Sequence, residues 1–174
     1  IKGQAINFTG EDTWFEIPAG NNLISPTITI SYWIKRTGTL RGQNAILWSK
    51  PASTYDGNGF YTMYPVDPRY SSFLVVDGWN GFYVSEDPND FLPENEWTHI
   101  VVTWDSNTRE GAIYKNGVQQ VITLLNTPVS ITPPKSGTAA NRFGMNGYTS
   151  SPDYPIGLQI DEFKIYNTVM NLSD

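Results

Sequence analysis

Apolar and polar residues alternate along much of this chain with a period of two, which is the pattern of half-buried β-strands. Residues 27–35 show it most clearly, because isoleucine or tyrosine holds each even position from 28 to 34 and mostly polar residues hold the odd ones. No stretch sustains the period of about 3.6 residues that marks a long helix. We predict strands near residues 4–9, 13–18, 26–36, 45–50, 59–65, 72–77, 81–85, 97–105, 110–116, 118–124, 140–145 and 157–167.

Turn residues between these runs favour antiparallel pairing. Asn116-Gly117 separates two β-rich runs and suits a two-residue hairpin turn, which needs positive φ twice. Residues 77–81 predict a second hairpin with a longer tip, and we expect loops at 51–58, 86–95, 126–139 and 146–156. The predicted fold is all-β, a two-sheet antiparallel jelly-roll sandwich. Its expected core includes Ile30, Tyr32, Ile34, Val101 and Phe163.

Composition narrows the possible partners. At 174 residues the chain suits one domain, and its 14% of aromatic residues argue against disorder. The net charge of −6 gives no electrostatic reason to bind nucleic acid, and no apolar run of about 18 residues could span a membrane. The absence of cysteine excludes disulfides and thiolate metal sites. The chain begins at Ile1 without a signal-peptide pattern, so we expect a piece of a longer protein.

Three segments carry a family resemblance. Residues 5–18 read Ala-Ile-Asn-Phe-Thr-Gly-Glu-Asp-Thr-Trp-Phe-Glu-Ile-Pro, residues 97–105 read Trp-Thr-His-Ile-Val-Val-Thr-Trp-Asp, and residues 160–167 read Ile-Asp-Glu-Phe-Lys-Ile-Tyr-Asn. In order and spacing the chain resembles the LamG-like branch of the concanavalin A-like lectin/glucanase superfamily. The resemblance implies a single jelly-roll domain over residues 1–174. Because that fold hosts enzymes, lectins and adhesion domains alike, function has to be argued from sites.

The residues that could support catalysis are few. His99 is the only histidine, and the resembled family has a histidine at this place in members without catalysis, so we interpret it as structural. Hydrolases of the superfamily carry Glu-x-Asp-x-x-Glu on one strand, because glycosidases need two carboxyl groups across the scissile bond. That spacing does not occur in this sequence. We therefore expect a domain that is not an enzyme.

Asp161 is a candidate metal ligand. It interrupts what reads as a buried final strand, and a buried charge is costly without a partner. In the resembled family this aspartate often joins carbonyls and an acidic residue of the first loop around a structural calcium ion. The resemblance therefore implies a Ca²⁺ site formed by Gly10, Glu11, Asp12 and Asp161. A salt bridge, or hydrogen bonds from backbone amides to Asp161, is the alternative.

Aromatic residues divide into two groups. The first falls on strands where packing would explain it: Trp14, Trp33, Trp97, Trp104, Tyr114 and Tyr166. The second lies in loops rich in asparagine, aspartate, serine and glycine, and Trp79 at the tip of a hairpin is its strongest member. Such a ring can stack on the apolar face of a sugar while nearby polar groups bind its hydroxyls. The predicted ligand site comprises Asp77, Trp79, Asn80, Tyr83, Asn146 and Tyr148.

These observations favour a non-catalytic, calcium-stabilised module that binds a glycan or polysaccharide. We expect it to belong, with other domains, to an extracellular or cell-surface protein, either an adhesin or a carbohydrate-active enzyme. A protein–protein interaction or structural module is the first alternative. A divergent glycoside hydrolase is the second.

Overall fold

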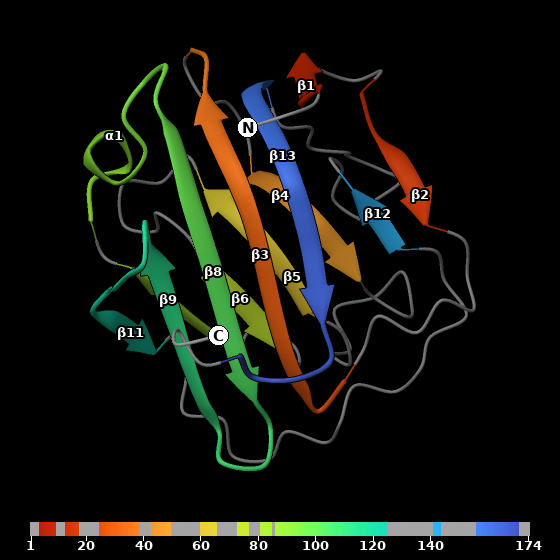
Figure 1. The fold of residues 1–174 in the computed structure, drawn as a ribbon, viewed down its shortest axis with the longest axis vertical. Helices are drawn as coiled ribbons and strands as arrows, with labels where there is room; N and C mark the ends of the chain where they lie inside the picture. The colour runs from red at the N-terminus through yellow and green to blue at the C-terminus, as the bar shows by residue number, and fades with distance from the viewer. Residues whose placement is uncertain are drawn as a thin grey trace.

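The computed structural model describes residues 4–9, 13–17, 25–38, 43–49, 60–65, 73–76, 81–84, 86–124, 141–143 and 156–170. Two sheets face each other with the core between them (Figure 1). The first has six strands in the order β1 (Ile6–Thr9), β13 (Ile156–Tyr166), β3 (Thr27–Arg36), β8 (Trp97–Asp105), β9 (Glu110–Lys115) and β10 (Val118–Gln119). The second has seven, in the order β11 (Ile122–Leu124), β7 (Gly81–Val84), β6 (Phe73–Val76), β5 (Phe60–Pro65), β4 (Gln43–Ser49), β12 (Asn141–Phe143) and β2 (Phe15–Ile17).

All neighbouring strands pair antiparallel, which confirms the predicted all-β jelly-roll sandwich. Asn116 and Gly117 both have positive φ, at 50° and 80°, as the predicted hairpin requires. The predicted strand at 118–124 is two strands, because β10 extends the six-stranded sheet and β11 the seven-stranded one. The predicted loop at 86–95 contains one helical turn, α1 (Pro88–Phe91). Within the described ranges, no helix is long and apolar enough to cross a membrane.

The core confirms four of the five predicted members and corrects the fifth. Ile30, Tyr32 and Ile34 are almost fully buried, and Phe163 packs against the same cluster. Val101 is only half-buried, because it lies between the inward-facing Ile100 and Val102 and therefore points away from the core. Three consecutive apolar residues cannot reveal which of two alternating faces is inside.

The prediction that six strand aromatic residues pack in the core is wrong for five of them. Of the six aromatic residues expected to be packed, only Trp104 lies in the core, where its ring stacks on Phe82 with centroids 5.7 Å apart. Trp14 precedes β2 and is 39% exposed. The remaining four are half-buried on the opposite side of the six-stranded sheet: Trp33, Trp97, Tyr114 and Tyr166. We call this side the outer face; on the two central strands β3 and β8 it carries the odd-numbered residues from Thr29 to Lys35 and from Trp97 to Asp105.

The C-terminal segment, residues 167–170, covers part of the outer face. After β13 the chain turns back and crosses in front of the sheet (Figure 1). Thr29, a buried threonine of β3, donates a hydrogen bond to the carbonyl of Thr168 (2.6 Å) and accepts one from the amide of Met170 (3.0 Å). Thr27 donates to the carbonyl of Asn167 (3.0 Å). The outer face is therefore neither fully solvated nor fully covered.

Candidate functional site

Of the six residues predicted to bind a ligand, the structure describes Tyr83. It lies in β7 between the buried Phe82 and Val84, so its side chain points away from the core. The other predicted ligand-binding residues lie outside the described residues: Asp77, Trp79, Asn80, Asn146 and Tyr148. Gly81, next to the predicted tip, begins β7 at the end of the sandwich where Phe82 contacts the start of β9.

Asp161 is the described member of the predicted calcium site. It lies at a bulge of β13, and the next residue, Glu162, has a left-handed backbone with φ of 48°. One carboxylate oxygen, Oδ1, accepts a hydrogen bond from the Glu162 amide (2.7 Å). The other, Oδ2, is buried and has no hydrogen-bond partner among the described residues. A buried carboxylate oxygen without a partner is costly, so this atom fits a bound cation.

The predicted partners of Asp161 fit less well. Gly10, Glu11 and Asp12 lie outside the described residues, but Thr9 and Thr13 on either side of them are described. Thr9 pairs with Ile156, five residues before Asp161, which is about 16 Å along a strand. The Thr9 amide donates to the side chain of Thr13 (3.0 Å), so both ends of this segment lie at the far end of β1 from Asp161. Among the described residues, no three His, Cys, Asp or Glu side chains gather as metal ligands.

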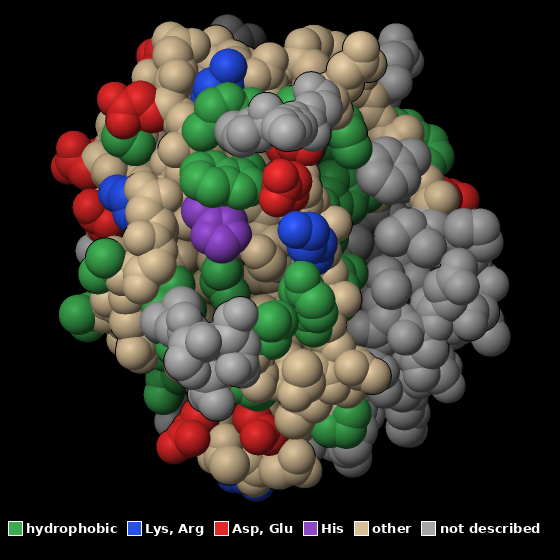
Figure 2. All heavy atoms as spheres, viewed as in Figure 1, with side chains coloured by type: hydrophobic (Ala, Val, Ile, Leu, Met, Phe, Trp, Pro, Cys, Tyr) green, Lys and Arg blue, Asp and Glu red, His purple; other side chains and the backbone are tan. Residues whose placement is uncertain are grey.

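His99 lies at the centre of the outer face, with hydrophobic, acidic and basic side chains around it (Figure 2). Its ring packs on Trp33, the cross-strand partner, with centroids 5.0 Å apart, and its Nε2 lies 2.9 Å from the Ser31 hydroxyl. Burial lowers the pKa of His99; the nearby Glu162 raises it and Lys164 lowers it further. Ser31 and His99 resemble a nucleophile and base, but no carboxylate hydrogen-bonds to His99 within the described part of the chain. The structural role of His99 stays a prediction.

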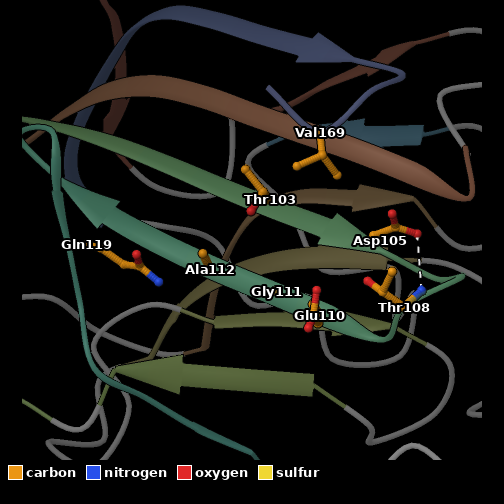
Figure 3. A pocket seen from close by; sticks show the side chains of 8 residues that line it. All are labelled: Thr103, Asp105, Thr108, Glu110, Gly111, Ala112, Gln119 and Val169. Carbon is orange, nitrogen blue, oxygen red and sulfur yellow. Dashed lines mark hydrogen bonds between the residues drawn. The ribbon is translucent and has the colours of Figure 1, made fainter. Parts of the chain in front are cut away.

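A groove of about 430 Å³ lies lower on the outer face, along β8, β9 and the C-terminal segment (Figure 3). Thr103 and Ala112, which are cross-strand partners, are small and form its floor. Val169 lies across from Thr103, and Asp105, Thr108 and Glu110 gather at the end nearest the β8–β9 turn. This groove was not predicted from the sequence. A run of small and polar residues at alternate positions of adjacent strands is its only trace in the sequence, since the C-terminal segment that forms one wall is distant along the chain.

The sequence model described as "Concanavalin A-like lectin/glucanases superfamily" matches residues 9–174 of this chain. The match covers nearly the whole sandwich. The chain belongs to the concanavalin A-like lectin/glucanase superfamily. No curated protein matches this chain in sequence.

Solved structures share the fold at low sequence identity. A candidate carbohydrate-binding protein from Bacteroides ovatus is 14% identical with a TM-score of 0.67, over 97% of this chain and 44% of its own. The NanB sialidase from Streptococcus pneumoniae is 15% identical with a TM-score of 0.67, over 97% of this chain and 26% of its own. A heptameric SAP-like pentraxin from Limulus polyphemus is 14% identical with a TM-score of 0.62, over 97% of this chain and 77% of its own. The superfamily domain thus corresponds to less than half the length of the Bacteroides and Streptococcus chains.

Proposed function

We propose that this domain is a non-catalytic carbohydrate-binding module of a larger extracellular or cell-surface protein. The observation that carries the proposal is membership of a lectin/glucanase superfamily over residues 9–174, in a chain without the Glu-x-Asp-x-x-Glu spacing of its hydrolases. A structural neighbour described as a candidate carbohydrate-binding protein, and sialidases of which such a sandwich forms about a quarter, support it. The parent would be an adhesin or a carbohydrate-active enzyme.

The proposed ligand surface includes the 77–83 hairpin and the 146–154 loop. Trp79 would stack on a sugar ring, with Asp77, Asn80 and Asn146 binding hydroxyls and Tyr83 or Tyr148 as a second platform. Binding of this kind is weak in water because sugar hydroxyls give up hydration, so we expect dissociation constants of about micromolar to millimolar.

Glycan-array binding followed by titration tests the function. Trp79→Ala should abolish binding and leave the melting temperature unchanged, because a hairpin tip contributes little to a core. Trp14→Ala, which removes a tryptophan that is 39% exposed outside the proposed surface, is the matched control and should bind as the parent does. Turnover of any polysaccharide would instead make the domain a hydrolase. Binding retained by Trp79→Ala would place the site elsewhere, with the concave face of the sheet as the next candidate.

We also propose that calcium stabilises the domain at Asp161, whose buried Oδ2 has no hydrogen-bond partner in the described part of the chain and would bind the cation. A ligand that binds only the folded state at one hundred times its dissociation constant adds about 2.7 kcal/mol of stability. EDTA should therefore lower the melting temperature, and Asp161→Asn should remove the difference. Asp12→Asn tests whether the 10–12 segment also binds the ion. It should reduce the effect of EDTA on the melting temperature only if that segment supplies a ligand. A melting curve that EDTA leaves unchanged would reject the calcium site.

A second candidate function, protein–protein interaction, is favoured by one observation. Three apolar side chains at the edge of the sandwich are exposed: Val118 at 65%, Val121 at 89% and Leu124 at 54%. Exposed apolar residues on neighbouring edge strands mark a possible contact with another protein. If the domain binds no glycan, and Val121→Asp weakens its binding to the adjacent domain of the parent protein, this function replaces the first.

A further inference from the structure

The groove on the outer face has a rigid wall. Thr29 bonds to both neighbours of Val169, donating to the carbonyl of Thr168 and accepting from the amide of Met170. Because both bonds use one hydroxyl that is 1% exposed, Val169 is held over the sheet opposite Thr103 (Figure 3). A wall fixed in this way needs little ordering when a ligand enters. The volume of about 430 Å³ lies within the range of small-molecule sites.

The end of the groove carries two carboxylates on adjacent strands. Asp105 and Glu110 are cross-strand partners at the β8–β9 turn. Asp105 Oδ1 accepts hydrogen bonds from the amides of Asn107 (2.7 Å) and Thr108 (3.4 Å), which fix the direction of its carboxylate. Within the part of the chain that the structure describes, neither carboxylate forms an ion pair. Like charges directly opposite each other destabilise a sheet, so this end of the groove favours a positively charged ligand.

The number of acceptors at the charged end suits an ammonium group better than a calcium ion. A protonated amine has three donors, and the side chains of Asp105, Thr108 and Glu110 supply acceptors at the same end of the groove (Figure 3). Calcium needs six to eight oxygens. The described residues gather no group of three acidic or histidine side chains that would supply them.

The rest of the groove suits the body of a sugar. Thr103 and Gln119 present a hydroxyl and an amide, which can bind sugar hydroxyls. Ala112 and Val169 present apolar surface that can contact the C–H face of a ring. Acceptors for an amine at one end and a mixed polar and apolar remainder match a carbohydrate that carries a free amino group.

Building on the carbohydrate binding proposed above, we propose that this groove is a subsite for an amino sugar with a protonated amine. The amine lies between Asp105 and Glu110, and the ring lies over Thr103 and Ala112 against Val169. The ligand class is therefore a glycan with deacetylated amino sugars, as distinct from a neutral or N-acetylated one.

The experiment titrates the domain with oligomers of glucosamine and with N-acetylglucosamine oligomers of equal length, at a pH that keeps the free amine protonated. Hydrogen bonds to charged groups predict about tenfold tighter binding of the free-amine form. The double variant Asp105→Asn/Glu110→Gln should remove this preference without weakening the N-acetylated form. Glu94→Gln/Glu96→Gln, which makes the same change in net charge at exposed residues outside the groove, should keep it. Ala112→Leu fills the floor and should weaken both oligomers.

Three results would overturn the subsite. One is equal binding of the two oligomers. Another is a preference for the free-amine oligomer that survives Asp105→Asn/Glu110→Gln. The third is loss of this preference in the Glu94→Gln/Glu96→Gln control as well, which would indicate attraction to net charge alone. If other glycans on the array bind in any of these cases, the proposed function stands and the groove assignment falls. If no glycan binds at all, both fall together. Thermal melting of each variant confirms that it is folded.

Discussion

The two faces of the six-stranded sheet are built from alternate residues of the same strands, yet they differ in average burial and in the polarity of their side chains. On β8 the inward residues Ile100, Val102 and Trp104 are at most 3% exposed and contact the opposite sheet's core residues. Among their outward neighbours, His99, Val101 and Asp105 are half-buried and only Thr103 is buried. One face therefore specifies the fold, and the other carries the groove that we propose as a binding site.

The outer face tolerates apolar residues because it is partly covered. Thr27 and Thr29 hold the C-terminal segment across the lower part of the sheet, and this segment forms a wall of the groove. Above it, Trp33 packs on His99 and Lys35 lies over Trp97 at 5.1 Å from the ring centroid. Each pair shields apolar surface without closing it off. Substitutions on such a surface should lower the free energy of unfolding less than substitutions in the core do.

The largest expected effect comes from the same change on each face. Val102→Ala should lower the free energy of unfolding by about 2 to 3 kcal/mol, because two buried methyl groups are lost and a cavity remains. Val101→Ala, one residue away on the outer face, should cost less than about 1 kcal/mol. Chemical denaturation of both variants measures the difference. Equal losses would show that the outer face is as closely packed as the core.

Removal of the anchor of the C-terminal segment should have an intermediate effect. Thr29→Val keeps the shape of the side chain but leaves the Thr168 carbonyl and the Met170 amide without their partner. We expect a loss of about 1 to 2 kcal/mol and faster hydrogen exchange at the Met170 amide. Thr27→Val, which removes one hydrogen bond to Asn167, is the control and should cost less. An unchanged exchange rate at Met170 would mean that other contacts hold the segment.

Much of the fold could be predicted from the sequence because its information is local. The alternation in residues 27–35 and the Asn116-Gly117 turn fix strand faces and a hairpin without reference to the rest of the chain. Val101 could not be placed, since Ile100, Val101 and Val102 present no contrast between faces. The helical turn at 88–91 was missed because four residues are too few to show a period.

The sites could be predicted less well because they combine distant segments. The groove joins β8 and β9 to Val169, which lies in a C-terminal segment held on the sheet by hydrogen bonds to Thr27 and Thr29. Asp161 stands out in the sequence as a carboxylate on a mostly apolar strand, and among the described residues its buried Oδ2 has no hydrogen-bond partner. Its role as a metal ligand stays a prediction. Its separation from Thr9, however, depends on the register of β1 with β13, and register cannot be read from the motif of either strand.

The smallest expected effect concerns the protonation of His99 on the outer face. Because burial lowers its pKa in the folded state, the unfolded chain binds a proton at this residue more readily than the folded one. As the pH falls through the ordinary range of histidine, the free energy of unfolding should therefore decrease, and above that range this contribution vanishes. His99→Gln should remove this part of the pH dependence. Because acidic residues also titrate, the quantity to compare is the difference in free energy of unfolding between the parent protein and His99→Gln at each pH.

Glu162→Gln sharpens the same measurement. Glu162 raises the pKa of His99 and opposes the effect of burial, so its neutralisation should lower that pKa further and steepen the loss of stability at low pH. NMR titration of the single histidine reads the shift directly. If the His99 pKa instead lies at or above that of histidine in the unfolded chain, the ring is solvated and the Trp33 contact does not bury it. The outer face would then behave as an ordinary solvated surface at His99, and it would differ from the core face more strongly than its partial burial suggests.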